Sequence, residues 1–144
     1  MQVSIMNELL LDTCAVIWTA TDDQLGMGTD IGRRLTESYD TGCRTYVSPI
    51  SAWELGMLTA CGKIRLERPL TKWFEEYINL GQISLAEMCP KILIESSYLP
   101  GTLPSDPADR VIIATARILN LQIVTRDRAI LEYAGKGYVQ ALRC

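Results

Sequence analysis

Short apolar segments alternate with helical segments along nearly the whole chain, and this alternation restricts the fold more than any other feature of the sequence. The predicted strands are 9–11, 44–48, 82–88, 121–127 and 137–142. One or two predicted helices separate each strand from the next. This pattern is typical of an α/β domain with a mostly parallel sheet and helices on both faces, and 144 residues fit one domain over 1–144.

The helices between these strands are predicted from apolar periodicity and from turn-forming residues at their ends. The predicted helices are 14–20, 30–42, 49–62, 69–81, 90–99, a helix beginning at Pro107, and 128–135. The helix over 69–81 is strongly amphipathic. Its aromatic residues Trp73, Phe74 and Tyr77 share one face, so we interpret them as core or dimer surface and not as a platform for stacking bases.

The sequence contains no histidine. This excludes Ser-His-Asp and Cys-His catalytic centres and histidine-ligated zinc, so any acid–base or metal chemistry must use carboxylates. The five cysteines are odd in number and form no C-x-x-C pair, which argues against disulfides and a zinc ribbon. We interpret all but Cys144 as small buried residues.

Two further features bear on location and partners. No apolar run approaches the roughly 20 residues of a membrane span, and the start MQVSIMNELLLDT lacks the marks of a signal peptide. A cytoplasmic protein without membrane contact is therefore expected. The net charge of −3 is unlike that of a tight, nonspecific duplex binder, but it suits an enzyme that meets nucleic acid briefly at one cleft.

One acid lies on the apolar face of a predicted helix. Asp106 suits the N-cap of that helix and Pro107 its first position. Asp109 then shares a face with Ile112 and Ile113, which are expected to be buried. Because acids are rarely buried without a partner, we expect a functional role for Asp109, whereas Asp106 is interpreted as a cap.

Three other acids occupy related positions. Glu54 shares an apolar helical row with Ile50 and Leu58, although a long charged side chain there can also reach water. Asp12 ends the first predicted strand and Asp127 follows the fourth. Each aspartate alone could cap a helix, but ligands of open α/β sheets bind beyond the carboxyl ends of the strands, where these acids can converge.

Convergence of these acids has an electrostatic consequence. Two carboxylates about 4 Å apart repel by roughly 4 kcal/mol at an effective dielectric constant near 20, and folding stability is typically only about 5–15 kcal/mol. The cluster must therefore hold protons or a cation. An all-oxygen site suits Mg²⁺ or Mn²⁺, which activate water and neutralise phosphoryl oxygens, so phosphodiester hydrolysis is predicted.

Four short motifs stand in an order and spacing that resemble a known family. They are LLLDT around Asp12, SPISAWELGML around Glu54, DPADRVIIATA around Asp109 and IVTRD around Asp127. Each motif is weak alone, but the ordered set extends over nearly the whole chain. It resembles the PIN-domain ribonucleases, specifically the VapC-type toxins of type II toxin–antitoxin modules.

The resemblance implies a PIN-like three-layer α/β/α fold with a five-stranded parallel sheet of order 3-2-1-4-5. It implies that all four motif acids are catalytic and line one pocket that holds Mg²⁺ or Mn²⁺. Asp12 and Asp109 are then the main metal ligands, and Asp127 completes the site directly or through water. Glu54 positions or deprotonates the attacking water.

The residues beside the motif acids have expected roles as well. By the same resemblance, Thr13 and Thr125 add hydrogen bonds at the rim of the site. Arg110, Arg126 and Arg128 adjoin the acidic motifs and are candidates for phosphate contact, although each is also typical of a solvated surface charge.

The implied activity is that of a metal-dependent endoribonuclease. The implied partners are an RNA substrate, a second copy in a homodimer, and a small VapB-like antitoxin whose tail covers the cleft, often with an arginine. Two alternatives stay open. An aspartate-nucleophile phosphatase usually needs a second aspartate where this chain has Cys14. A non-catalytic PIN-like scaffold that binds RNA or protein can dispense with the acids, which are all present here.

Overall fold

Five parallel strands form one sheet in the predicted order, β3-β2-β1-β4-β5. The computed structural model of the chain describes residues 8–21, 37 and 39–144. Its elements are β1 (Leu9–Leu11), α1 (Thr13–Thr21), β2 (Thr45–Val47), α4 (Pro49–Ala60), α5 (Leu70–Leu80), β3 (Ser84–Leu85), α6 (Pro90–Glu95), α7 (Pro107–Leu119), β4 (Gln122–Thr125), α8 (Arg128–Gly135) and β5 (Gln140–Arg143). The helix predicted over 30–42 lies largely outside the described residues. No described helix combines the length and the apolar character needed to cross a bilayer.

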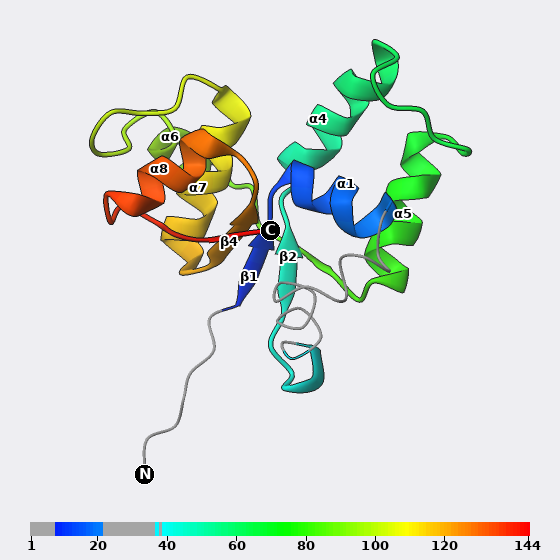
Figure 1. Cartoon of the computed structure of the whole chain (residues 1–144), viewed down its shortest axis with the longest axis horizontal. Coiled ribbons are helices and arrows are strands. Elements are labelled where there is room, and N and C mark those ends of the chain that lie inside the picture. The colour runs from blue at the N-terminus through cyan, green and yellow to red at the C-terminus, as the bar shows by residue number, and fades with distance from the viewer. Residues whose placement is uncertain (1–7, 22–36, 38) are drawn as a thin grey trace.

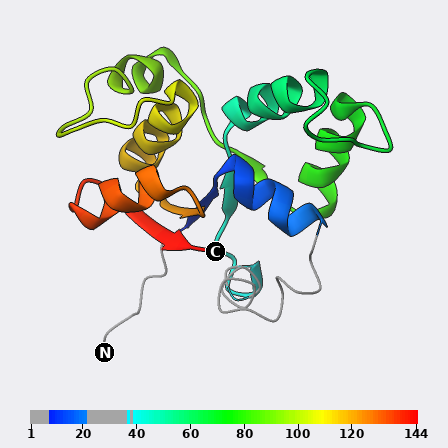
Figure 2. The same ribbon diagram turned by 45° about the horizontal axis from the view of Figure 1, so that its top comes forward.

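Helices cover both faces of the sheet, so the three-layer α/β/α prediction is confirmed. Helices α6, α7 and α8 lie on one side of the strands, and α1, α4 and α5 lie on the other (Figure 1). The tilted view in Figure 2 shows the same two groups separated by the sheet. Successive side chains of β1 point to opposite faces of the sheet. Leu10 therefore belongs to the core under α7, and Leu9 and Leu11 belong to the core under α1.

The register of the central strands sets where a site can form. Leu11 of β1 pairs with Val47 of β2 and with Val124 of β4. The residues that follow along β1 and β4, Asp12 and Thr125, therefore lie at the same edge of the sheet. This is the edge from which α1 and α4 start, and parallel sheets commonly bind ligands there.

Helix α7 has clear local reasons for its boundaries. The Asp106 carboxylate accepts hydrogen bonds from the backbone N–H groups of Ala108 and Asp109 at 2.8 and 3.4 Å, and Pro107 occupies the first turn. Asn120 ends the helix in the left-handed conformation, at φ 55°, which Asn tolerates better than most residues. The buried face of α7 includes Ile112, as predicted.

Helix α5 carries the aromatic cluster that was interpreted as core or dimer surface. Trp73, Phe74 and Tyr77 pack against the core cluster under α1. The rings of Trp73 and Tyr77 stack with centroids 5.5 Å apart, and the Tyr77 hydroxyl lies 2.7 Å from Thr19 Oγ1. All three side chains are partly buried and belong to the edge of the core, and a part in a dimer surface stays a prediction.

Several expectations about local structure differ from the result; for example, the strand predicted over 82–88 covers only Ser84–Leu85. The last strand begins at Gln140 instead of 137, because Gly137 adopts φ 89° in a turn and the ring of Tyr138 packs against Tyr133, with centroids 4.9 Å apart. The interpretation of the cysteines as buried residues is wrong: Cys61 is exposed and the others are half-buried, although all five are free thiols as expected.

Candidate active site

A cavity of about 330 Å³ opens at the carboxyl ends of β1 and β4, and its wall is acidic. Five carboxylates line it: Asp12, Glu54, Asp106, Asp109 and Asp127. They come from the end of β1, from α4, from the start of α7 and from the end of β4. The fold therefore brings together all four acids that the sequence marked, together with the capping acid of α7.

Asp12 is buried and held by hydrogen bonds on both carboxylate oxygens. Oδ1 accepts from the backbone N–H of Thr13 at 2.8 Å, and Oδ2 accepts from the Thr125 hydroxyl at 2.7 Å. Burial raises the pKa of Asp12, although these hydrogen bonds act in the opposite direction. The threonines thus orient Asp12: Thr13 lines the cavity, whereas Thr125 is completely buried and is not among the described residues of the wall.

Among the described acids of the cavity, Asp109 has the carboxylate whose charge is least balanced by hydrogen bonds or ion pairs. Its residue is only 6% exposed, and within the described part of the chain no hydrogen bond or ion pair reaches its carboxylate. Burial, followed by the nearby charges of Asp127 and Asp12, raises its pKa to about 8. A buried carboxylate in this state needs either a proton or a cation.

Glu54 is joined to the first strand–helix junction by a hydroxyl. Thr13 Oγ1 donates to Glu54 Oε1 at 2.5 Å, and it also lies 2.9 Å from the Ser51 hydroxyl oxygen. Burial raises the pKa of Glu54, and the charges of Asp12, Asp106 and Asp127 act in the same direction. A raised pKa suits a carboxylate that must accept a proton near neutral pH.

The two remaining acids of the wall also cap helices. Asp127 Oδ1 accepts from the backbone N–H of Ile130 at 3.1 Å at the start of α8, while Asp106 caps α7. Each cap commits one carboxylate oxygen and leaves the other oxygen available. Capping and a role in the cavity are therefore compatible for Asp127, and the sequence had presented them as alternatives.

Replacing Asp106 tests whether it is only a cap. We expect Asp106→Ala to lower the free energy of unfolding by about 1 kcal/mol, because two backbone N–H groups of α7 lose their acceptor. Asp106→Asn keeps an acceptor oxygen and should stay close to the parent. Thermal unfolding of the parent and both variants, with and without Mn²⁺, measures these changes in stability. Equal destabilisation by both variants, or loss of the response to Mn²⁺ in either, would contradict the assignment.

The three arginines expected near phosphate have different surroundings. Arg126 lines the cavity, its Nε donates to the Cys144 carbonyl at 3.1 Å, and its guanidinium lies 5.4 Å from the centroid of the Trp18 ring. Arg110 donates through Nε to the Pro104 carbonyl at 2.7 Å and is not part of the cavity wall. Arg128 is exposed at the start of α8. Among the described residues of the wall, Arg126 is the only cation.

The donor set fits a hard divalent cation. Its donors are carboxylate oxygens, which Mg²⁺ and Mn²⁺ prefer, and the unpartnered carboxylate of Asp109 gives such an ion a specific electrostatic role. In the described part of the chain, no three acidic or cysteine side chains already stand in metal-holding geometry. Binding would therefore require rotation of the acids toward one another, which their mutual repulsion opposes until a cation is present.

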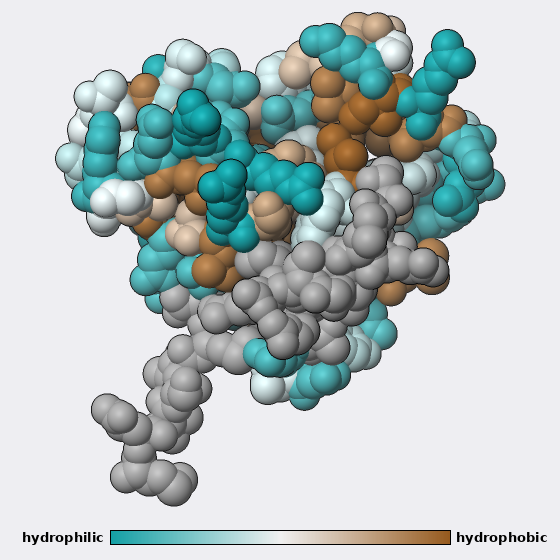
Figure 3. Space-filling model, viewed as in Figure 1, coloured by the Kyte–Doolittle hydropathy of each residue, from teal (hydrophilic) through white to brown (hydrophobic). Residues whose placement is uncertain are grey.

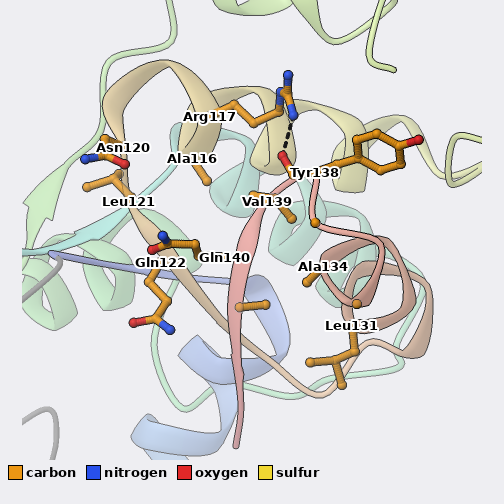
Figure 4. Close-up of a pocket in the computed structure, with 13 residues that line it drawn as sticks. Ala116, Arg117, Asn120, Leu121, Gln122, Leu131, Ala134, Tyr138, Val139 and Gln140 are labelled. Carbon is orange, nitrogen blue, oxygen red and sulfur yellow. Dashed lines mark hydrogen bonds between the residues drawn. The ribbon is translucent and has the colours of Figure 1, made fainter. Parts of the chain in front are cut away.

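A second cavity, of about 790 Å³, lies at the opposite end of β4 and β5 (Figure 4). Its wall includes Arg117, Asn120 and Tyr138 but no carboxylate or cysteine. The Arg117 guanidinium donates to the Tyr138 carbonyl, as the dashed line in Figure 4 shows. Although this cavity is larger, the described residues of its wall bring together no cluster of carboxylates, so the acidic cavity is the candidate active site.

Sequence reasoning missed two residues close to the acids. The thiol of Cys14 lies 3.4 Å from Asp12 Oδ2 and lines the cavity, where burial raises its pKa to about 11; it had been interpreted as ordinary packing. Ser51 is completely buried against Thr13. The available signal for Ser51 was its position three residues before Glu54, which places both on one helical face.

Comparison with known proteins gives one family match and one curated relative. The family model described as "PIN domain" matches residues 9–136. Ribonuclease VapC22 of Mycobacterium tuberculosis is 29% identical over 126 residues, which cover 87% of this chain and 91% of the relative.

Solved structures share the fold. One is the crystal structure of VapBC2 from Rickettsia felis bound to a DNA fragment from their promoter, with a TM-score of 0.67 and 13% identity over 94% of this chain and 98% of that chain. Another is DNA-bound VapBC from Salmonella typhimurium, with a TM-score of 0.66 and 19% identity over 96% and 98%. At these identities the likeness is one of fold.

Proposed function

The chain belongs to the PIN domain family, and on this premise we propose that it is a Mg²⁺- or Mn²⁺-dependent endoribonuclease, the toxin of a type II toxin–antitoxin pair, formed by a single domain over 1–144. The observation that carries this proposal is the buried, unpartnered carboxylate of Asp109, which faces other acids in one cavity. The name of the relative Ribonuclease VapC22 supports RNA as the substrate.

Asp12, Asp109 and Asp127 are the residues that would hold the ion. The ion, when bound, supplies Lewis-acid polarisation of the phosphodiester and a lowered pKa for water. Thr125 supports this set, because its hydroxyl donates to Asp12 Oδ2 and accepts from the backbone N–H of Asp127 at 2.9 Å. One buried hydroxyl thereby fixes the relative position of two of the three acids.

Glu54 is the proposed general base. It is held by the Thr13 hydroxyl, its pKa is raised mainly by burial, and it lines the same cavity as the aspartates from α4. The water oxygen attacks phosphorus, and the water proton passes to the Glu54 carboxylate. The bond from phosphorus to the ribose oxygen breaks, its electron pair stays on that oxygen, and the oxygen leaves as a hydroxyl after it takes a proton from solvent. Arg126 is placed to contact a phosphate oxygen at the cavity wall.

The direct test is RNA cleavage by the purified protein, freed of any bound partner. Cleavage is expected with Mg²⁺ or Mn²⁺, loss of cleavage with excess chelator, and recovery when the ion is returned. A parallel preparation of a variant lacking Asp12 controls for contaminating ribonuclease. An unchanged rate in chelator would contradict the metal assignment, and failure to cut any RNA under all these conditions would contradict the nuclease assignment.

The partner proposals follow from charge and exposed surface. A VapB-like antitoxin is supported by the VapBC structures that share this fold, and a cationic side chain of such a partner suits a wall with five acids and one arginine. A homodimer is supported by exposed Trp53 and Met57 of α4. Apolar surface gathers over the region of α4 and α5 in Figure 3. A cytoplasmic location remains our prediction.

Neither alternative from the sequence gains support from a specific contact. A phosphatase of the aspartate-nucleophile type needs an acid at position 14, and the thiol of Cys14, with its pKa raised to about 11, does not replace one. A non-catalytic scaffold has no need for a buried, unpartnered Asp109. Metal-dependent hydrolysis of RNA is therefore the function that the geometry supports best.

A further inference from the structure

We propose that Ser51 is a positioning residue of the candidate active site and fixes the Glu54 carboxylate through the hydroxyl of Thr13. The inference rests on the proposed function, because it gives Ser51 a part in the same reaction. Ser51 is not in the wall of the acidic cavity. It therefore acts through Thr13 and not by contact with substrate.

The three side chains form a continuous row across two elements. Ser51 lies in the first turn of α4 and is 0% exposed, and Thr13 begins α1 and is 5% exposed. The Ser51 and Thr13 hydroxyl oxygens are 2.9 Å apart, and Thr13 Oγ1 is 2.5 Å from Glu54 Oε1. Because Ser51 and Glu54 are three residues apart on one helix, both face Thr13.

The Thr13 hydroxyl is the donor in both contacts. Its Oγ1 donates toward Glu54 Oε1 and toward the Ser51 hydroxyl oxygen. A hydroxyl has one proton, and an ionised carboxylate only accepts, so Ser51 and Glu54 share the proton of Thr13. The two acceptors together fix the rotation of this hydroxyl.

The local structure favours this arrangement over an ordinary helical serine. Helical serines commonly bond the carbonyl four residues earlier, which here is that of Val47. No such bond is recorded for Ser51 among the described residues. In the described part of the chain, the partner recorded for the Ser51 hydroxyl is Thr13. Without that bond, a completely buried hydroxyl would be left unsatisfied, which is costly.

Loss of the Ser51 hydroxyl should loosen Glu54 without altering the cavity wall. The Thr13 hydroxyl then loses one of the two acceptors that fix its rotation, so the base is held less well for proton abstraction. We expect Ser51→Ala to lower kcat about threefold to tenfold, the value of one hydrogen bond, with KM for RNA unchanged. Ser51→Thr keeps the hydroxyl and should recover most of the loss.

A matched control separates positioning from stability. Ser96 is also buried, at 9% exposed, and donates to the Leu93 carbonyl at 2.6 Å at the end of α6, away from the acidic cavity. Ser96→Ala should destabilise the protein to a similar degree and leave kcat unchanged. In a Glu54→Gln background, Ser51→Ala should change kcat less than twofold, because the base that it positions is absent.

Crystal structures of the parent and of Ser51→Ala supply a readout that does not depend on activity. The variant is expected to show the Glu54 carboxylate displaced from Thr13 or disordered; if this variant does not fold, Ser51→Cys, a near-isostere with a weak acceptor, replaces it. An unmoved, ordered Thr13–Glu54 contact would overturn the proposal, as would a kcat equal to that of the parent or an equal loss in the Glu54→Gln background. A parent that cuts no RNA would count against the proposed function, and the crystal structures would still decide the role of Ser51.

Discussion

Asp12→Asn is expected to reduce RNA cleavage by at least about 10³-fold, the scale of losing a charged group from the catalytic machinery, while the fold remains. The substitution removes the negative charge at the end of β1, where a cation would be held, and changes no volume. Asp12 lines the cavity and is held by the backbone N–H of Thr13 and the hydroxyl of Thr125. No other acid of the described wall occupies that position.

The same contacts limit the damage to the fold. The Asn carbonyl can still accept from the backbone N–H of Thr13, and its amide then faces the Thr125 hydroxyl, whose proton loses its acceptor. That loss costs about 1 kcal/mol and is opposed by relief of a buried charge. Circular dichroism and thermal unfolding check the fold, and Asp40→Asn, at an exposed residue, is the control. Cleavage within tenfold of the parent would show that Asp12 is not a metal ligand.

Asp109→Asn is expected to stabilise the metal-free protein at alkaline pH. The pKa of Asp109 is raised from its ordinary value of 3.8 to about 8, first by burial and then by Asp127 and Asp12. The folded state thus holds this proton more tightly than the unfolded chain does. Its stabilising contribution is complete below about pH 4 and is lost as the pH rises through 8, so the metal-free parent should become less stable over this range.

The expected loss of stability is large enough to be measured by calorimetry. We expect the parent to lose about 2 kcal/mol from this group between pH 5 and pH 9, after allowance for solvent screening, which corresponds to a fall in Tm of about 5 °C. In Asp109→Asn, Tm should fall little over this pH range. Asp106→Asn, which removes a charge from the same helix turn, should keep most of the fall in Tm.

Metal binding should make the parent more stable than Asp109→Asn, the reverse of the order expected without metal at alkaline pH. Mn²⁺ added at pH 8 stabilises a protein that binds it only when folded, so the parent should gain in Tm and Asp109→Asn should gain much less. If Tm of the parent and of the variant changed with pH in the same way, the negative charge of Asp109 would have to be balanced by another group. Identical responses to Mn²⁺ would exclude it as a ligand.

The agreement between predicted and observed fold comes from local periodicity. Leu9, Leu10 and Leu11 form an apolar run because both faces of β1 are covered, and this composition is visible in the sequence. The exact ends of strands were less predictable. β5 starts only where Gln140 can pair with Gln122, which depends on the position of a strand far away in the sequence.

The site residues likewise divide into those that the sequence predicted and those that it did not. Asp109 was marked by an apolar helical face, and Glu54 by an apolar row, because burial of a charge is unusual wherever it occurs. Thr125 was expected at the rim, but the pairing of β1 with β4 places it under Asp12. Ser51 carried no signal beyond its spacing from Glu54, since a small polar residue in a helix has many ordinary roles.

The sequence by itself determined the alternation of strands and helices, the family, and the four acids that depart from their apolar surroundings. These properties depend on composition and spacing, which are local. Only the tertiary structure decided which hydroxyl serves which carboxylate, that Asp109 has no partner among the described residues, and that Cys14 and Ser51 lie beside the acids. Hydrogen bonds have strict limits of distance and angle, and those limits are met only when segments remote in the chain are packed together.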